Sequence, residues 1–454
     1  MTIPMVYDFS VNFGRCFSIF APAILASIFL GGLMILSCRT NEKLSLPKND
    51  LFFLVVSMWI CTAIVCAFPF YVYPSIKLKF MSALFEAVSG ITTTGATVYQ
   101  NVEILPKALN LWRFILHFIG GVGIVAIGIV VLPIMRIGGM QLFQTENSDK
   151  SQKFFPRASQ TIRFFIGLYL LLIGIFVMCF RFAGMTLFDA VCHGISVIST
   201  GGFSTKNAGL DFFQSNNIKI IASIGMLIGG FTFLEIAKCF QNGVKTFLLN
   251  KQTAGYLKLI AVFVFLPIII AMIIDSEQVS FHEIASHIFT TISAITTTGL
   301  DFANNFMPSN LLLIILAIVG GCSGSTTGGI KIFRIQILST ILKIYVKKLL
   351  YPYDVSVPKY QQQRVSNDLT NSVISYIVSL VLTFLISSFL LELYLKIGIA
   401  EVSYIVSACL FNWGTVISDA QLPSIAKLIL SIDMIAGRLE VVPLFAIFHR
   451  LFRK

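Results

Sequence analysis

The stretch ITTTG occupies residues 91–95 and returns unchanged at residues 295–299, both times in otherwise apolar surroundings. Three threonines and a glycine have a low propensity for the interior of a helix, because threonine is β-branched and glycine has an unusually free backbone. Each copy follows an apolar piece of about a dozen residues, roughly half of what a membrane-spanning helix needs. The repetition therefore indicates two equivalent interruptions of helical structure.

The composition around these stretches is that of an integral membrane protein. Of the 454 residues, 56% are hydrophobic and only 12% are charged, whereas an average soluble domain has about 25% charged residues. The nine cysteines are scattered and form no C-x-x-C pair. We expect them to be small apolar residues and not a metal or disulfide framework.

Apolar runs that are long enough to span a membrane recur along the whole chain. The first covers residues 17–36, and since it lacks a charged start and a cleavage motif, we expect a retained transmembrane helix. Later long runs lie near residues 51–74, 111–135, 161–182, 218–240, 255–274, 309–345, 369–395 and 423–449. Shorter apolar pieces lie between alternate members, at residues 81–91, 186–198, 283–295 and 401–411. The pattern long, short, long is therefore repeated four times.

A turn rich in Ser, Thr, Asn and Gly follows each short piece. The four turns read TTTGAT at 92–97, STGGFS at 199–204, TTTGLD at 296–301 and NWGTVI at 412–417. Aligned on Gly95, Gly201, Gly299 and Gly414, they recur at similar intervals, as internal repeats do. The alignment predicts four units, each with a helix, a half-helix, a re-entrant turn and a second helix. We place the units at residues 50–150, 151–250, 251–362 and 363–454, after an N-terminal helix and linker in residues 1–49.

The net charge of +12 is best explained by membrane topology, because basic residues gather in cytoplasmic loops. If the loop after the first helix is cytoplasmic, the loops on that side hold most of the Lys and Arg residues, including the cluster from Lys331 to Arg364. This orientation puts the four turns on the outer side and the C-terminus in the cytoplasm. It also removes the reason to infer nucleic-acid binding.

Four such turns can surround one axis and bind a cation. Irregular backbone at membrane depth is tolerated only where it is buried in protein or lines a watery cavity. Carbonyl oxygens aimed at the axis can replace the water shell of a monovalent cation, and the negative ends of the half-helices favour a cation there. The candidate ligands are Thr93, Thr94, Gly95, Ser199, Thr200, Gly201, Thr297, Thr298, Gly299, Asn412, Trp413 and Gly414.

An acid lies in or just before the first half of each short piece. Such positions suit the positive end of a helix dipole, although acids that merely face the outer water are an equally good interpretation. The four acids are Glu86, Asp189, Glu283 and Glu401.

These motifs resemble the TrkH/KtrB (Trk/Ktr/HKT) superfamily of potassium transport proteins, most closely the TrkH branch. The matching stretches are FEAVSGITTTGAT at 85–97, LPIMRIGGMQLF at 132–143, ISTGGFST at 198–205, GGCSGSTTGGIKIFR at 320–334 and GRLEV at 437–441. The resemblance implies an all-α polytopic membrane protein, with four parallel M1–pore-helix–M2 repeats around a central pore and an N-terminal transmembrane helix. It also implies potassium uptake across a bacterial cytoplasmic (inner) membrane, with no covalent cofactor and no metal besides potassium. The implied partners are a second copy in a homodimer and a cytosolic nucleotide-binding regulatory subunit of the TrkA/KtrA type.

The chain departs from this family in the fourth turn and at its N-terminus. Family members usually read NNxGPG where this chain has FNWGTVIS at 411–418, so Trp413 and Thr415 leave the selectivity of the fourth quadrant open. Members of the TrkH branch usually open with two extra helices, and one clear span precedes residue 50 here. In the plant relatives, a serine in place of the first filter glycine accompanies sodium preference, so Gly95 favours potassium. A sodium-permeable or sodium-coupled relative is the alternative.

The stretch GGCSGSTTGG at 320–329 interrupts the apolar run 309–345. An unbroken helix over that run would be about 55 Å long, far beyond the thickness of a bilayer, so we expect a break within the membrane. Close packing through small residues is one explanation. The explanation that we favour, which the resemblance also implies, is a flexible gate beneath the turns. The gate residues are Gly320, Gly321, Gly324, Ser325, Thr326, Gly328, Gly329 and Arg438.

Arg438 lies in the middle of the last long run, too deep to reach water easily. A charge at such depth is by default functional or paired. We expect it to face the cavity as a positive barrier at the gate. A structural pair with Glu440 or another acid is the alternative.

No nucleophile–base constellation is apparent, so we do not expect an enzyme. The stretch HEIASH at 282–287 resembles a zinc motif but has one residue too many, which puts His282 and His287 about 140° apart around a helix. A secondary transporter for an organic solute is the alternative from another class. Transporters with broken helices often have inverted repeats, whereas the loops here predict parallel repeats.

Overall fold

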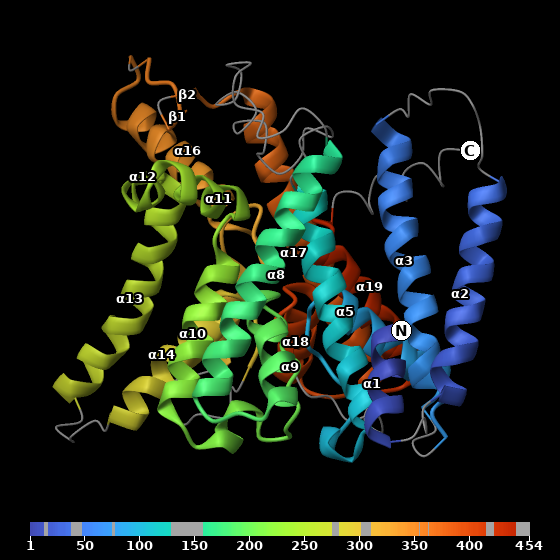
Figure 1. The fold of residues 1–454 in the computed structure, drawn as a ribbon. Helices are drawn as coiled ribbons and strands as arrows, with labels where there is room; N and C mark the ends of the chain where they lie inside the picture. Colours follow the sequence, from blue (N-terminus) through green and yellow to red (C-terminus); the bar gives the residue numbers. More distant parts are fainter. Residues whose placement is uncertain are drawn as a thin grey trace.

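The described part of the chain is mainly helical and has one short hairpin, in a computed structural model (Figure 1). The structure describes residues 1–12, 17–37, 48–74, 78–128, 158–274, 281–300, 310–353, 355–361, 363–414 and 422–441. The N-terminal helices are α1 (Thr2–Asn12) and α2 (Phe17–Ser37). The short helix α1 was not predicted, and α2 is the expected leading span.

Four units follow, each with a long helix, a short helix and one or more further helices. The first unit has α3 (Lys48–Val72), α4 (Phe80–Ile91), η1 (Val102–Ile104) and α5 (Lys107–Ala126). The second has α8 (Ala158–Phe182), α9 (Leu187–Ile198), η3 (Gly209–Phe213), α10 (Asn216–Gly230), α11 (Phe233–Asn242) and α12 (Val244–Leu249).

The third unit has α13 (Lys251–Ile274), α14 (Phe281–Ile295), α15 (Asn310–Val319), α16 (Ile332–Leu350) and an antiparallel hairpin of β1 (Lys359–Tyr360) and β2 (Gln363–Arg364). The fourth has α17 (Asn367–Leu395), α18 (Ile399–Leu410) and α19 (Ser424–Arg438). The four short helices lie within a few residues of the predicted half-helices, and each follows a long helix, as predicted.

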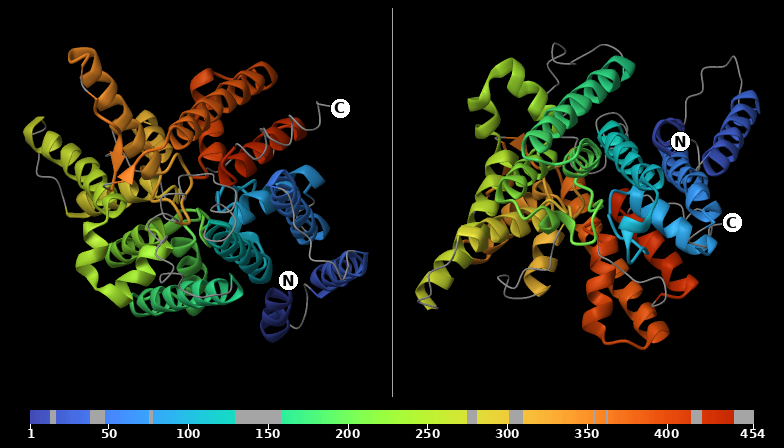
Figure 2. Two further views of the ribbon diagram at one scale, coloured as in Figure 1. Left: turned by 90° about the horizontal axis from the view of Figure 1, so that it is seen from above. Right: turned by 60° about the horizontal axis from the view of Figure 1, so that its bottom comes forward.

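The four units surround one axis (Figure 2). Three short helices contact the first α-helix after the turn of the preceding unit, in the pairs α5 with α9, α10 with α14 and α15 with α18. The contact of α19 with α4 joins the fourth unit back to the first and closes the ring. The second unit carries its own break, since α10 and α11 meet at an angle of 95°. A single span over 218–240 is therefore wrong for this chain.

The outer faces of the long helices are apolar. Within the described residues, six helices are long and apolar enough to cross a membrane, or seven if the bent pair α10 and α11 is one span. Large apolar side chains such as Leu25, Phe53, Leu171, Phe265 and Phe389 are about half exposed, as expected of side chains that face lipid. The chain is therefore an all-α polytopic membrane protein, as the composition predicts. The segments α16, β1 and β2, which carry the predicted cytoplasmic basic cluster, lie at the opposite end of Figure 1 from α9 and α14.

Candidate functional site

The four turns have the same backbone geometry. In each turn an N–H group donates to the carbonyl oxygen five residues earlier, across 2.8–3.0 Å. The donors are Thr94, Gly201, Thr298 and Trp413, and the acceptors are Ser89, Ser196, Ser293 and Ala408. The residue before each donor is left-handed, with φ of 53° at Thr93, 49° at Thr200, 53° at Thr297 and 57° at Asn412. This conformation is uncommon for residues other than glycine, so the same strained turn is built four times.

This pattern corrects the sequence alignment in the second turn by one residue. The equivalents of Gly95, Gly299 and Gly414 include Gly202, not Gly201, because Gly201 occupies the position of Thr94. Ser199 accordingly lies at the helix end, together with Thr92, Thr296 and Phe411. Because residues 201 and 202 are both glycine, the sequence of this turn can be aligned in two ways, and only the hydrogen bonds distinguish them.

The four equivalent glycines form a closed ring, which we call the four-turn ring. A Cβ atom on Gly95 would lie 2.3 Å from Cα of Gly202, and one on Gly202 would lie 2.6 Å from the carbonyl oxygen of Thr298. One on Gly299 would lie 1.5 Å from the carbonyl oxygen of Trp413, and one on Gly414 would lie 2.4 Å from that of Thr94. No side chain fits at any of these contacts. Glycine is therefore required so that the four backbones can meet.

Most hydroxyl groups of the turns stabilise the turns themselves. The hydroxyl of Thr92 donates to the carbonyl oxygen of Val88 at 2.7 Å and lies 2.7 Å from that of Thr94. The pair Thr296 and Thr298 repeats this arrangement at 2.7 Å. The amide of Asn412 donates to Thr94 Oγ1 at 2.9 Å, which ties the fourth turn to the first. Backbone carbonyl groups are thus the main oxygen atoms left for a ligand on the axis.

Trp413 is completely buried behind the fourth turn. Its ring packs edge-on against Tyr404 of α18, with ring centroids 5.1 Å apart. Its backbone follows the shared turn geometry in spite of the divergent sequence. Thr415, the other unusual residue, lies outside the described residues.

A cavity of about 420 Å³ opens on one side of the ring. Gly95, Gly202 and Gly299 line its floor, so three of the four turns face it. Charged side chains also line it: Arg113, Lys206 and Asp211. The cavity is large enough to hold several water molecules above the ring.

The glycine-rich loop, residues 320–331, lies on the other side of the ring. It separates α15, which ends at Val319, from α16, which begins at Ile332, so the predicted break is confirmed. The loop fills the bend between α10 and α11. Its N–H groups at Cys322 and Thr326 donate to the carbonyl oxygens of Gly230 and Gly229, and Gly324 accepts from the N–H of Phe233. These bonds satisfy backbone groups that the broken helix leaves free.

The glycine-rich loop also contacts three of the turns. The hydroxyl of Thr200 lies 3.2 Å from that of Thr326, and the N–H of Gly328 donates to Thr297 Oγ1 at 2.6 Å. A Cβ atom on Gly328 would lie 2.1 Å from the carbonyl oxygen of Phe411. The turn residues that the loop contacts precede the ring glycines and lie on the side away from the large cavity. The loop therefore packs against three of the four turns, on the side away from the large cavity.

Arg438 is buried at the end of α19 and contacts the loop. Its Nη1 donates to the carbonyl oxygen of Thr326 at 2.6 Å, while its Nε and Nη2 have no hydrogen-bond partner among the described residues. Glu440 pairs with Arg334 at 2.5 Å, so the alternative of an Arg438–Glu440 pair is wrong. A small space of about 20 Å³, lined by Arg438 and by Lys331 of the loop, remains beneath the ring.

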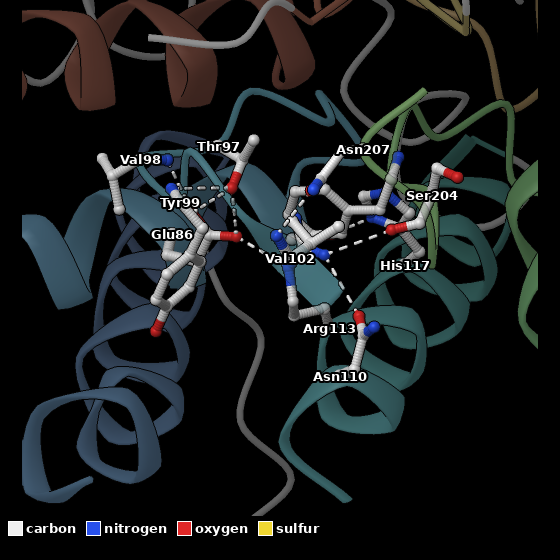
Figure 3. Close-up of polar contacts among 12 residues, drawn as sticks. Glu86, Thr97, Val98, Tyr99, Val102, Asn110, Arg113, His117, Ser204 and Asn207 are labelled. Carbon is white, nitrogen blue, oxygen red and sulfur yellow. Dashed lines mark hydrogen bonds and ion pairs between the residues drawn. The ribbon is translucent and has the colours of Figure 1, made fainter. Parts of the chain in front are cut away.

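The four acids of the short helices do not share one environment. Glu283 and Glu401 are exposed, as the water-facing interpretation predicts. Glu86 and Asp189 are buried and accept hydrogen bonds from the segments that follow the first and second turns. The cluster around Glu86 and Arg113 (Figure 3) was not predicted, because its members are far apart in the sequence.

The two histidines of the HEIASH stretch are not paired. His282 is exposed and its Nδ1 lies 2.9 Å from Asn216 Oδ1, while His287 is buried with its Nε2 3.2 Å from the carbonyl oxygen of Val264. The two side chains therefore contact different helices, and the zinc interpretation has no support.

Comparison with known proteins yields consistent matches over nearly the whole chain. The TrkH family model, described as a cation transport protein, matches residues 17–260 and 243–452. The chain is 33% identical to the Trk system potassium uptake protein TrkG of Escherichia coli strain K12, covering 91% of this chain and 87% of that protein. It is 31% identical to the TrkH protein of Halomonas elongata, covering 95% and 92%. The crystal structure of the potassium transporter TrkH from Vibrio parahaemolyticus superposes with a TM-score of 0.90 at 25% identity, covering 100% of this chain and 96% of that one.

Proposed function

Because this chain belongs to the TrkH family of cation transport proteins, we propose that it takes up potassium ions across the cytoplasmic membrane of a bacterium. The observation that carries the proposal is the closed ring of Gly95, Gly202, Gly299 and Gly414. The relatives at about this similarity are named potassium uptake proteins of the Trk system. The chain acts as a transport subunit and not as an enzyme.

Ion selection takes place at the four-turn ring. A potassium ion enters the outer cavity with its water shell and exchanges that shell for carbonyl oxygens of the turns. Candidate ligands are the carbonyl groups of the twelve residues named from the sequence, with Gly202 added and Ser199 displaced to the helix end by the observed register. The C-terminal ends of α4, α9, α14 and α18 point to the ring and add negative potential there.

The glycine-rich loop closes the pathway below the ring. Its contacts with Thr200, Thr297 and Arg438 support a closed state, because they attach the loop to the second, third and fourth units. Opening requires the loop to leave these contacts, and its glycines permit the necessary backbone change. The guanidinium of Arg438 adds a positive barrier next to the path.

The assembly and sidedness follow from the same family membership. We propose a homodimer in the inner membrane, with the C-terminus in the cytoplasm and a cytosolic nucleotide-binding subunit of the TrkA/KtrA type on the basic inner face. The cluster of basic residues from Lys331 to Arg364 supports this surface. Residues 50–150, 151–250, 251–362 and 363–454 are the proposed units, each with one turn. No covalent cofactor and no metal besides the transported ion is needed.

The alternative within the same fold is a sodium-permeable or sodium-coupled relative. The observation that favours it is the divergent fourth turn, in which Asn412 and Trp413 replace the threonines of the first and third turns. The observation against it is that Gly95 and all its equivalents are glycine. The permeability ratio of the two ions decides between them.

The test is growth rescue at low potassium in a bacterium that lacks its own potassium uptake systems, together with direct uptake of radioactive rubidium. We expect rescue by the parental chain with its cytosolic partner, and loss of rescue with Gly95→Ser. A correctly inserted parental chain that carries neither potassium nor rubidium would falsify the proposal.

A further inference from the structure

The joint between the first and second units contains a buried charged network, of which Arg113 and Phe203 also line the outer cavity. We call Glu86, Arg113, His117 and Phe203 the seam cluster. Glu86 belongs to α4, Arg113 and His117 belong to α5, and Phe203 follows the second turn. All four side chains are at most 1% exposed. Figure 3 shows how Glu86, Arg113 and His117 converge behind the first two turns.

Glu86 fixes the segment that leaves the first turn. Its carboxylate accepts hydrogen bonds from the hydroxyl of Thr97 at 3.0 Å and from the N–H of Val98 at 3.0 Å. The same carboxylate pairs with Nε of Arg113 at 2.8 Å. Bonds with a charged partner are about twice as strong as neutral ones, and burial strengthens them further. The chain three residues beyond Gly95 is therefore tied firmly to the scaffold.

Arg113 extends this attachment to the second turn. Its guanidinium stacks on the ring of Phe203 at 3.9 Å, and its Nη1 donates to the carbonyl oxygen of Ser204 at 3.4 Å. Phe203 and Ser204 directly follow the ring glycine Gly202. The buried ion pair of Glu86 and Arg113 therefore contacts the segments that follow two adjacent turns.

His117 joins the two turns a second time. Its Nδ1 lies 2.8 Å from the carbonyl oxygen of Gly90 in α4, and its Nε2 accepts from the N–H of Phe203 at 3.3 Å. Since a carbonyl oxygen can only accept, Nδ1 carries the proton and the imidazole is neutral. The imidazole ring is stacked on Phe203 at 4.2 Å, and its Cδ2 would lie 2.3 Å from a Cβ atom on Gly201. This contact explains why the second turn has glycine at 201 as well as at 202.

The seam cluster is absent from the other units where they can be compared. Gly120, Gly229 and Gly437 are equivalent, because a Cβ atom on each would lie against the last carbonyl oxygen of the short helix, at Ile91, Ile198 and Leu410. Counting back from them, Ala222 and Leu430 replace Arg113, and Met226 and Met434 replace His117. When the chain is aligned on the four ring glycines, the position of Glu86 is occupied by His193, Thr290 and Ile405. Since the fold builds these other units without the network, the network is not needed for the fold as such.

We propose that Glu86, Arg113 and His117 are positioning residues that determine how well the four-turn ring distinguishes potassium from the smaller sodium ion. Gly95 and Gly202 are neighbours in the ring, and the chains that leave both are attached to the same ion pair. The ring cannot contract around a smaller ion at this joint without breaking buried charged bonds. A ring held at fixed size keeps its carbonyl oxygens matched to potassium. The inference rests on the proposed function, since it requires the ring to be the site of ion selection.

The decisive variant is the double substitution Glu86→Met and Arg113→Met. Apolar replacement of both partners avoids an unpaired buried charge, so we expect the variant to fold. Purified protein is reconstituted with its cytosolic partner, and the sodium-to-potassium permeability ratio is measured from reversal potentials in proteoliposomes. We expect the ratio to rise at least about fivefold, the lower end of typical coupling between two sites, while potassium still passes.

Lys219→Met is the matched control. Lys219 is a buried cation on the corresponding helix α10, bonded to Ser286 of α14 and to Asp211 of η3, well beyond Gly202, whereas the seam cluster binds residues that closely follow a ring glycine. Its loss is expected to leave the permeability ratio unchanged. A monodisperse double variant with the parental ratio overturns the inference, as does an equal shift in the Lys219→Met protein. If the parental chain itself conducts no potassium, the proposed function fails instead.

Discussion

Arg438 donates a 2.6 Å hydrogen bond from Nη1 to the carbonyl oxygen of Thr326, and this bond joins the last helix of the fourth unit to the glycine-rich loop of the third. Bonds of charged donors contribute about 1.5–3 kcal/mol, and 1.4 kcal/mol corresponds to about a tenfold change in an equilibrium. We therefore expect Arg438→Gln to raise the resting rubidium flux about tenfold or more, since the loop is released and the positive barrier is gone. Unchanged flux in a correctly inserted variant contradicts a role for Arg438 in the gate.

Thr326 is also tied to the second unit. Its hydroxyl lies within 3.0 Å of the carbonyl oxygens of both Ile198 and Gly229, to which it donates. A neutral hydrogen bond contributes about 1 kcal/mol, so we expect Thr326→Val to raise resting rubidium flux roughly fivefold. Thr383→Val is the control, because among the described residues that hydroxyl bonds within α17, to the carbonyl oxygen of Ser379. Equal flux in both variants argues against a closed state held by the loop.

The contact of Gly299 with Trp413 predicts a strict requirement for glycine. A Cβ atom on Gly299 would lie 1.5 Å from the carbonyl oxygen of Trp413, and the φ of Gly299 is +76°. We expect Gly299→Ala to abolish uptake, as measured with rubidium in cells that express equal amounts of protein. Gly174→Ala in α8 meets nothing within 4 Å and should retain parental uptake. Parental uptake in Gly299→Ala cells is incompatible with the observed ring.

Trp413 supports the fourth turn from behind. Removing a fully buried tryptophan leaves a cavity that costs about 3–5 kcal/mol. We expect Trp413→Ala to lower the thermal midpoint in detergent and to weaken selectivity, whereas Trp413→Phe should keep most of both because it can still pack on Tyr404. Thermal unfolding followed by size-exclusion chromatography measures the first effect and reversal potentials the second. Identical midpoints for the two variants contradict a packing role.

Asp433 of α19 is another buried acid, but it differs from Glu86. It is 2% exposed, its Oδ1 accepts from the hydroxyl of Ser387 at 2.8 Å, and no cation pairs with it among the described residues. An asparagine amide oxygen can accept the same hydrogen bond from Ser387, and no ion pair is lost with the replacement. Asp433→Asn should therefore keep the parental thermal midpoint, while Glu86→Gln should lower it by leaving Arg113 unpaired. The reverse order of midpoints would refute this assignment.

The local features of the fold were predictable from the sequence. The lengths of the apolar runs gave the long and short helices, and the break at the glycine-rich loop followed from a run too long for one span. The placement of the turns after α4, α9, α14 and α18 was predictable too, because Ser, Thr and Gly are poor continuations of a helix. The bend between α10 and α11 was missed, although Gly229 and Gly230 stand directly before it, because the apolar run continues beyond them.

The sequence by itself determined that the chain has four re-entrant turns and which residue types form them, because hydrophobic run length and backbone preference are local properties. Only the tertiary structure decided that Gly202 joins the ring, that Glu440 pairs with Arg334 and leaves Arg438 to Thr326, and that α19 closes the ring against α4. The same holds for Glu86 and Arg113, 27 residues apart, and for Arg438 and Thr326, 112 residues apart. Such contacts depend on how four units pack around one axis. The number of residues between two positions in the sequence does not determine the distance between them in the folded protein.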